Sequence, residues 1–421
     1  MAKSIAQNLP RGLPGLINVP IAENRATSTQ IASGVTYGFS NSSAASDFPH
    51  HYSFCGGNWE WYNATKRQPV SFHFGNGSDP SASGASTAGG IVRFATWANK
   101  FEVLVQNYLG FRIKVNGKYL QDGMYGVAAL NGDASGFDRW FLFDFTGTEF
   151  AGTGLKQIEL SSTITRFGGV RVPAGYTVEP WPQAVPIRAA LCGDSMPSTF
   201  SDSADSRTAR HGNMGEILKT LTGIPDLWIT SLGGCGFISD SSGTRSTFLE
   251  QATYDLSEKN YDVVWEIGGR NDAPYYGSEA SYRALVEQWI EIYLADNPDT
   301  LIFMTGPLSV TSTEAAGTAM QTMQRAKKAA AAKYPQNCAF IETCGNSVTA
   351  DPWIFGSGRV GATAGDGNAD LVRGTDGVHP SVFGHQYLAH RIATETARVI
   401  PLLASRIRNG VIPMVNDDDL T

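Results

Sequence analysis

The chain has 421 residues, of which 42% are hydrophobic and 17% charged, and it contains 46 glycines. This composition argues against a disordered chain or a coiled coil, and the length favours a soluble globular protein of two or three domains. A formal net charge of −7 without a long basic run argues against nucleic acid and anionic membranes as partners. No apolar run approaches the roughly 20 residues that span a bilayer.

The N-terminus, MAKSIAQNLPRGLPGL, lacks the apolar central segment of a secretory signal. The sequence as written therefore predicts a cytoplasmic protein, unless export takes another route. The five cysteines are odd in number and form no CxxC pair, so neither a disulfide framework nor a zinc site is indicated. We expect buried free thiols at Cys55, Cys192, Cys235, Cys338 and Cys344.

Residues 1–30 show no usable pattern and are treated as an N-terminal extension. From 31 to 180, short strand-like runs alternate with glycine- and asparagine-rich turns, which predicts an all-β sandwich or jelly-roll domain. The segment VEPWPQAVP, with three prolines in nine residues, is then typical of a linker. The clearest predicted strands are 101–107, 110–117, 139–147, 155–162 and 168–175.

The aromatic segment HHYSFCGGNWEWYN (50–63), followed by FHF (72–74), allows two interpretations. The aromatic rings can form the core of the sandwich, or they can form a platform on which sugar rings stack. Both interpretations stay open, with the core favoured. The second would make the sandwich a carbohydrate-binding domain.

After residue 186 the pattern becomes strand, loop, helix, repeated. Near-continuous apolar strands that alternate with helices predict a parallel sheet covered on both faces, a three-layer α/β/α domain over 187–405, with a tail at 406–421. Strands are expected at 187–192, 227–232, 261–268, 300–306 and 338–343, and helices at 212–221, 278–296, 313–334 and 381–407.

Ligands bind beyond the carboxyl ends of the strands in such a sheet, so the residues that follow each strand matter most. Together they supply an acyl-transfer site: Ser195 as nucleophile, His379 as its base and Asp376 as the acid that orients the base. Backbone N–H groups of Ser195 and of a glycine, with the Asn271 amide, would bind the oxyanion. The segments concerned are Gly193-Asp194-Ser195, GGCG (233–236), GGRND (268–272) and DGVH (376–379).

These four segments, in this order, resemble the four sequence blocks of the SGNH (GDSL-type) hydrolases. The resemblance covers about 187–405 and implies a flavodoxin-like fold, with Ser195, His379 and Asp376 as the triad. It places Ser195, Asn271 and a glycine in the oxyanion hole; Gly236 is favoured and Gly234 is the alternative. The sequence departs from the commoner GDSL at Met196.

The sequence around Ser195 allows two other interpretations. A Gly-Asp-Ser turn alone is most often a helix cap. The α/β-hydrolase elbow G-x-S-x-G fits less well, because Pro197 stands at its fifth position.

Neighbouring polar residues have structural interpretations. Asp194 is expected to stabilise the turn, and Asp272 to be a structural hydrogen-bond acceptor for its loop. Arg270 either neutralises an anionic substrate or, as favoured, pairs with a carboxylate. Glu266, in a covered strand, needs a partner or faces the interdomain side. His385 and His390 are expected at helix-surface or packing positions.

Within the SGNH family, a β-sandwich ahead of the catalytic domain resembles carbohydrate esterases. We therefore expect a serine esterase that removes O-acetyl groups from a polysaccharide and requires no metal or organic cofactor. Acetylated polysaccharide or oligosaccharide would be the partner, and the oligomeric state stays open.

Two alternatives remain from the sequence alone. A lipid or thioester hydrolase would prefer long acyl chains. A phage tail protein or adhesin would bind glycans mainly through the sandwich, and a virion protein acting on an extracellular glycan would need no signal peptide.

Overall fold

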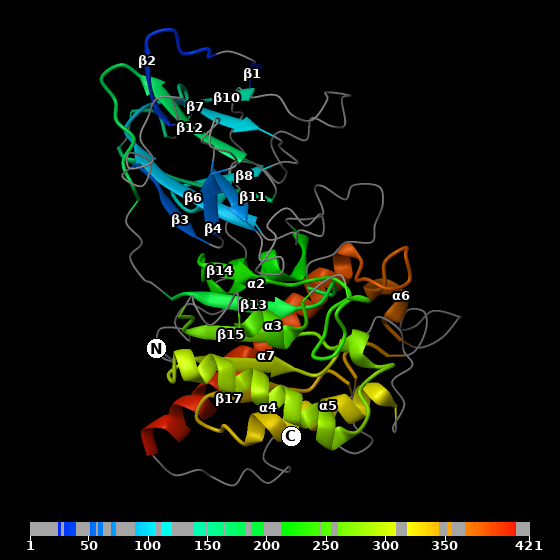
Figure 1. Ribbon diagram of the computed structural model, residues 1–421. Coiled ribbons are helices and arrows are strands. Elements are labelled where there is room, and N and C mark those ends of the chain that lie inside the picture. Colours follow the sequence, from blue (N-terminus) through cyan, green and yellow to red (C-terminus); the bar gives the residue numbers. More distant parts are fainter. Residues whose placement is uncertain are drawn as a thin grey trace. The chain divides into compact units, whose positions relative to one another are not determined.

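The computed structural model describes residues 24–26, 29–38, 51–55, 58–61, 69–72, 89–106, 111–119, 139–148, 150–152, 154–163, 166–181, 187–197, 212–243, 246–253, 260–308, 318–344, 352–355 and 367–409. These residues separate into two compact units, with the border between Pro186 and Ile187 (Figure 1).

The first unit contains two antiparallel five-stranded sheets that share one core, so the predicted β-sandwich is confirmed. A two-stranded ribbon, β4 (Asn58–Trp61) and β5 (Pro69–Phe72), accompanies them. Across the first sheet, the strands follow in the order β1 (Asn24–Ala26), β10 (Arg139–Asp144), β7 (Lys100–Gln106), β12 (Arg166–Pro173) and β2 (Gly34–Gly38). Across the second sheet, the order is β3 (Ser53–Cys55), β6 (Gly89–Thr96), β11 (Lys156–Thr163), β8 (Phe111–Val115) and β9 (Lys118–Tyr119).

Alternation along these strands builds the core. Ile113 and Val115 of β8 are buried, as their spacing predicts, and Phe141 and Phe143 of β10 bury the same face of the other sheet. β1 lies in the N-terminal segment where no pattern was recognised, and it pairs with β10. Its three residues are too few to show a period.

The aromatic segment at 50–63 contributes to this core through Tyr52. Its ring packs edge-on against Phe94 and Phe167, and only 3% of the residue is exposed. The side chains of the β4 tryptophans and residues 73–74 lie outside the described part of the chain. The sugar-platform interpretation therefore stays a prediction.

The second unit is built on one five-stranded sheet whose order is β14-β13-β15-β16-β17, with every neighbouring pair parallel. This is the flavodoxin-like order, so the predicted α/β class is confirmed. All five strands fall where the apolar runs predict them: β13 (Ala189–Gly193), β14 (Leu227–Ile229), β15 (Val263–Ile267), β16 (Leu301–Thr305) and β17 (Cys338–Ile341).

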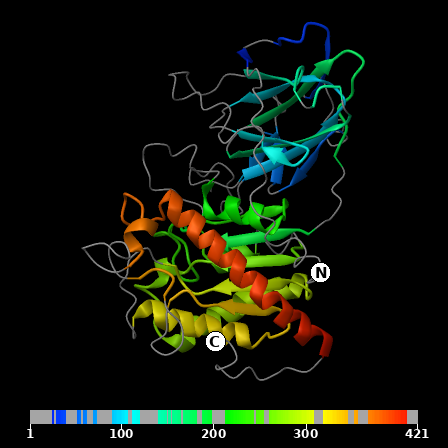
Figure 2. The same ribbon diagram turned by 180° about the vertical axis from the view of Figure 1, so that it is seen from behind.

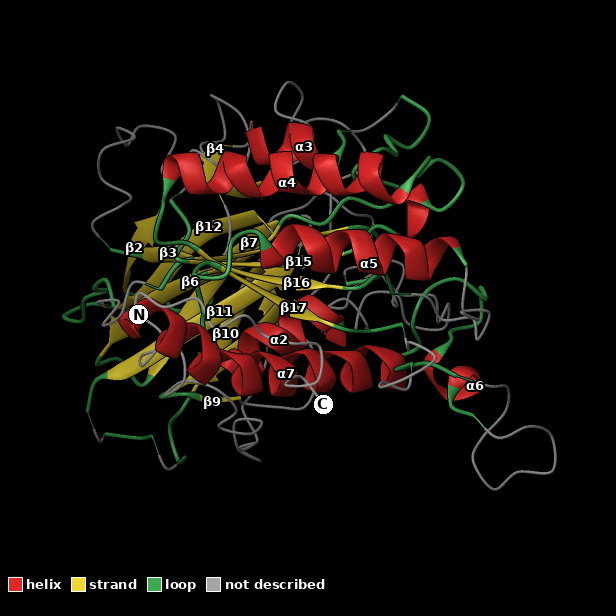
Figure 3. Ribbon diagram, turned by 90° about the horizontal axis from the view of Figure 1, so that it is seen from below, coloured by secondary structure: helices red, strands yellow, loops and turns green. Residues whose placement is uncertain are grey.

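Helices cover both faces of this sheet. Figure 3 shows α4 and α5 on one face and α2 and α7 on the other, and Figure 2 shows α7 crossing the sheet from behind. The short α3, α6 and η6 have no counterpart in the sequence-based prediction. The helices are α2 (Met214–Thr222), α3 (Phe248–Gln251), η6 (Arg270–Asp272), α4 (Glu279–Asp296), α5 (Ala319–Ala332), α6 (Ala369–Val372) and α7 (Val382–Asn409).

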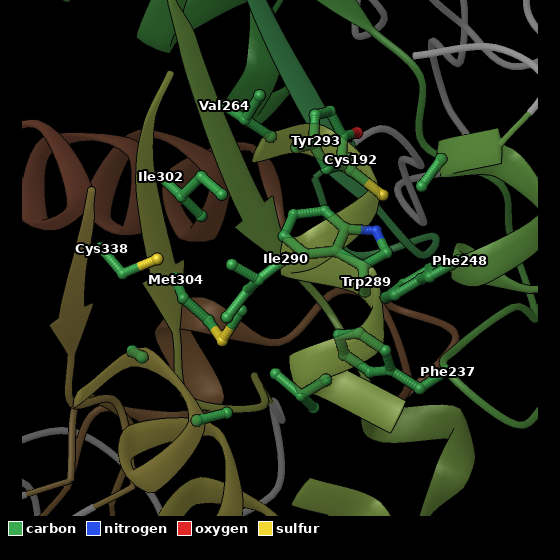
Figure 4. Close-up of a cluster of buried hydrophobic side chains, with 14 of the residues drawn as sticks. Cys192, Phe237, Phe248, Val264, Trp289, Ile290, Tyr293, Ile302, Met304 and Cys338 are labelled. Carbon is green, nitrogen blue, oxygen red and sulfur yellow. The ribbon is translucent and has the colours of Figure 1, made fainter. Parts of the chain in front are cut away.

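Alternate strand residues serve the two faces. Cys192, Val264 and Met304 point into a cluster under α4 and α5 that is centred on Trp289 (Figure 4). On the other face, the Trp265 indole donates a hydrogen bond of 3.1 Å to Thr396 on α7. None of the described helices combines the length and apolarity needed to cross a membrane.

The Tyr52 hydroxyl provides a test of the sandwich core. It donates to the carbonyl of Tyr37 and accepts the N–H of Val170 at 3.0 Å, next to a register shift in β12. We expect Tyr52→Phe to lower the free energy of unfolding by about 1 to 3 kcal/mol, because a buried N–H loses its acceptor. Urea denaturation measures this, and Tyr37→Phe, which removes an exposed bond to Tyr176, should cost less.

Candidate active site

Ser195 lies in the tight turn that follows β13, and it is half-buried. The Asp194 carboxylate accepts the N–H of Met196 at 2.8 Å, so Asp194 stabilises the turn as expected. Gly193 is required here, because a Cβ would collide with the carbonyl of Ile267. Met196 is 1% exposed and belongs to the core.

Asp376 and His379 form a close pair on the loop before α7. Oδ2 of Asp376 lies 2.6 Å from His379 Nδ1, and Oδ1 accepts the N–H groups of Val378 and His379, both at 2.9 Å. Partial burial raises the pKa of Asp376, but these hydrogen bonds outweigh it and hold the pKa below its ordinary value. The carboxylate therefore stays ionised and holds the ring by Nδ1, and Nε2 is the ring nitrogen that this contact does not use.

Arg270 links two of the loops. Its guanidinium donates to the carbonyl of Val378 at 3.3 Å, one residue before His379. This bond ties the loop of Asn271 to the loop of Asp376 and His379. The charge of Arg270 also attracts the buried Asp194 carboxylate, which agrees with the favoured prediction, whereas binding of an anionic substrate stays a prediction.

Asn271 lies at the carboxyl end of β15, where its amide donates to the carbonyl of Cys235 at 2.9 Å. One amide hydrogen is thereby used to hold the side chain, and the second is left over. The bond joins the segment after β15 to the segment after β14, so the structure brings these two predicted blocks together.

Asp272 is fully buried and accepts four hydrogen bonds, so it is a structural acceptor as predicted, but its donors lie in the segment after β14 and on α4 and not in its own loop. The Tyr282 hydroxyl donates at 2.9 Å, and burial with the nearby carboxylate raises the pKa of Tyr282 well above its ordinary value. The other donors are the N–H groups of Phe237, Ile238 and Ser239, at 2.8, 3.0 and 2.8 Å.

The two candidate oxyanion glycines differ in this arrangement. The N–H of Gly236 donates to the carbonyl of Ser239 at 2.9 Å, so it must release that bond before it binds an oxyanion. A side chain at Gly236 would also collide with the Asp272 carboxylate. In the described part of the chain, the N–H of Gly234 has no partner, and Gly234 adopts φ +81°.

Glu266 finds a partner that the sequence analysis left open. Its Oε2 lies 2.5 Å from the ammonium of Lys327, and both side chains are 0% exposed. Burial raises the pKa of Glu266 from 4.5 to about 7, against the attraction of Lys327. Lys327 was not singled out earlier, although it occupies the apolar face of its helix together with Met323 and Ala330.

No hydrogen bond joins Ser195 to His379, both of which are described. Nucleophile and base are often loosely aligned before substrate binds. His385 is buried and accepts the N–H of Met214 at 3.1 Å, and His390 is exposed, as their predicted packing and surface positions require. All five cysteines are buried and free, as predicted. Among the described residues, no group of three His, Cys, Asp or Glu side chains could hold a metal ion.

No protein-family model and no curated protein matches the sequence. Solved structures do match. A salicylyl-acyltransferase from a tetracycline biosynthetic pathway has a TM-score of 0.60 at 14% identity, over 88% of this chain and 98% of its own. A family two carbohydrate esterase from Clostridium thermocellum, in complex with cellohexaose, has a TM-score of 0.55 at 14% identity, over 83% of this chain and 99% of its own.

An acetyl xylan esterase from the rumen bacterium Butyrivibrio proteoclasticus has a TM-score of 0.52 at 11% identity, over 88% of this chain and 98% of its own. The chain has the SGNH-hydrolase fold of carbohydrate esterases. The likeness extends over nearly the whole length of these SGNH-fold proteins, so it includes the sandwich as well as the α/β unit. At these identities it concerns the fold alone.

The buried Asp194 should make stability depend on pH. Burial raises its pKa from 3.8 to about 6, so between these values the folded chain holds a proton that the unfolded chain has released. Stability from this group is thus full below about pH 4 and is lost as the pH rises through about 6. Relative to wild type, the free energy of unfolding of Asp194→Asn should therefore increase by on the order of 2 to 3 kcal/mol as the pH rises from 4 to 7.

Urea denaturation across this pH range measures the effect of Asp194→Asn. The exposed Asp299→Asn is the control and should leave the pH profile unchanged. Parallel profiles for wild type and Asp194→Asn would contradict a raised pKa at this carboxyl.

Asp272→Asn tests the loop attachment. A carboxamide has one acceptor oxygen, so it cannot serve four donors, and we expect a loss of about 1 to 3 kcal/mol for each buried donor left without a partner. Asp240→Asn is the matched control, because the Asp240 side chain accepts the N–H of Gly243 at an exposed position. Equal melting temperatures for both variants would argue against the attachment.

Proposed function

We propose that this protein is a serine esterase that removes O-acetyl groups from a polysaccharide through an acyl-enzyme. Ser195 is the nucleophile, His379 the general base and Asp376 the residue that orients it. The observation that supports this best is the 2.6 Å contact between His379 Nδ1 and Asp376, in the loop before α7 of an SGNH fold. A histidine held in this way presents Nε2 to a serine.

In the first half of the reaction, His379 Nε2 takes the proton of Ser195 while Oγ attacks the acetyl carbonyl. The resulting imidazolium is stabilised by the ionised Asp376. His379 then gives the proton to the sugar oxygen as the bond between that oxygen and the acetyl carbon breaks; the sugar leaves with a free hydroxyl, and the acetyl group stays on Ser195. In the second half, His379 activates a water that releases acetate.

The oxyanion of each tetrahedral intermediate needs donors that are already in place. The N–H of Ser195 and the second amide hydrogen of Asn271 are two of them. For the third we favour the N–H of Gly234, because the N–H of Gly236 is engaged with Ser239. The bond from Asn271 to the Cys235 carbonyl keeps the amide oriented without substrate, which lowers the reorganisation that binding requires.

Polysaccharide is the favoured substrate because similar structures include a carbohydrate esterase that holds cellohexaose and an acetyl xylan esterase. The similar salicylyl-acyltransferase supports a second candidate, in which an alcohol instead of water accepts the acyl group. Both candidates use the same acyl-enzyme, so they differ only in the last step.

Ser195→Ala should abolish release of acetate from p-nitrophenyl acetate and leave the melting temperature unchanged, because no hydrogen bond joins the hydroxyl to another described residue. His379→Ala should also be inactive, whereas the exposed His390→Ala on α7 should match wild type. A pH-stat or chromogenic assay measures all three. Retained turnover in Ser195→Ala would refute the assignment.

The substrate class is tested with p-nitrophenyl esters of increasing chain length and with acetylated xylan, pectin and bacterial capsule. A deacetylase should lose activity beyond two or three acyl carbons, because a small acyl site excludes longer chains. Activity that rises with chain length would favour a lipid esterase. Product analysis with added alcohol separates hydrolysis from acyl transfer.

A further inference from the structure

Lys327 is a fully buried cation in the α/β unit that the proposed mechanism does not use. Its ammonium lies 2.5 Å from Oε2 of Glu266 and donates to the carbonyl of Gly268 at 3.0 Å. An ammonium that has lost all contact with water is stable only where charges and acceptors replace its hydration. Here the acceptors come from β15 and from the residue just after it.

The Gly268 carbonyl lies at a sensitive place, three residues before Asn271. Between them, Gly269 turns the chain with φ +100°, and Gly268 itself has no room for a side chain. A Cβ on Gly268 would lie 3.1 Å from the backbone nitrogen of Asp194 and 2.8 Å from the Phe248 ring. The segment that Lys327 holds therefore packs against the nucleophile turn on one side and leads to Asn271 on the other.

The helix that carries Lys327 is itself fixed to the sheet. One turn earlier on α5, the Gln324 side chain accepts the N–H groups of Thr343 and Cys344 at 3.0 and 2.8 Å and donates to the Cys344 carbonyl at 2.5 Å. These bonds attach α5 to the segment that follows β17. The ammonium is thus delivered to a defined point beneath the carboxyl edge of the sheet.

Two further interactions connect Lys327 with the site. Its charge attracts the buried carboxylate of Asp194, the residue just before Ser195. Oδ2 of Asp194 has no hydrogen-bond partner among the described residues. Its ammonium also lies 5.8 Å from the ring centroid of Phe237, in the segment after β14. One cation therefore interacts with all three strand ends that supply the proposed nucleophile and oxyanion donors.

We propose that Lys327 is a positioning residue for ester hydrolysis: it holds the Gly268 carbonyl and thereby sets the position of Asn271 against the oxyanion. This inference rests on the proposed function. An oxyanion donor acts only at the right distance, and a misplacement of about 1 Å can cost up to a hundred-fold in rate. Substrate binding in the ground state depends much less on this distance, so the effect should fall on kcat and not on KM.

The test uses the double variant Glu266→Gln/Lys327→Met in the full chain. Lys327→Met alone would leave a buried carboxylate without its cation, whereas the double variant removes both charges and keeps the volumes similar. We expect it to fold, with kcat for p-nitrophenyl acetate lowered ten- to a hundred-fold and KM unchanged. The matched control is Lys328→Met/Glu342→Gln, which removes a partly exposed ion pair one residue further along α5 and should keep kcat.

Amide hydrogen exchange gives a readout that needs no activity. Exchange should accelerate at 268–272 in the double variant, relative to the control, while the rest of the sheet stays protected. Wild-type kcat, or unchanged exchange at 268–272, would overturn the inference. So would a general loss of protection with a matching fall in melting temperature, since that describes a purely structural ion pair. If wild type hydrolyses no ester, the proposed function fails, and the exchange result still decides whether Lys327 positions this segment.

Discussion

The candidate site depends on the hydrogen bonds that the buried carboxylate of Asp272 accepts. This carboxylate brings a negative charge into a fully buried position, and such a charge is tolerated only when donors surround it. Three of the donors are consecutive N–H groups of 237–239, so the segment after β14 is wrapped around one side chain from the segment after β15. Asn271 precedes Asp272 directly, and its position against the β14 segment follows from this attachment.

The same logic explains the charges below the sheet edge. Asp194, Glu266 and Asp272 place three carboxyl groups in a small buried volume, and burial raises the pKa values of Asp194 and Glu266 to about 6 and about 7. Lys327 and Arg270 are the cations that oppose this, from α5 and from η6. A site that stabilises a developing oxyanion benefits when the nearby carboxyl groups are partly protonated or paired, because free negative charge would oppose it.

The sequence predicts the parallel sheet and the pair of Asp376 and His379 for physical reasons. The five parallel strands are buried on both faces and therefore appear as continuous apolar runs, such as 187–192 and 261–268. The Asp376 and His379 pair is local, three residues apart on one loop. The pair of Glu266 and Lys327 was not predictable, because 61 positions separate the two and their contact depends on how α5 packs across the sheet.

The position of His379 relative to Ser195 depends on how two helices pack. The pair of Asp376 and His379 forms within one loop, where Gly377 turns the chain at φ +73°. The connection to the turn of Ser195, the proposed nucleophile, runs through α7 and α2. His385, near the start of α7, accepts the N–H of Met214 at the start of α2, and the next N–H of α2 donates to the carbonyl of Pro197 at 3.2 Å. Since an acceptor nitrogen carries no proton, this imidazole serves in its neutral form. A change that shifts α7 against α2 would therefore move His379 relative to Ser195 without altering either residue.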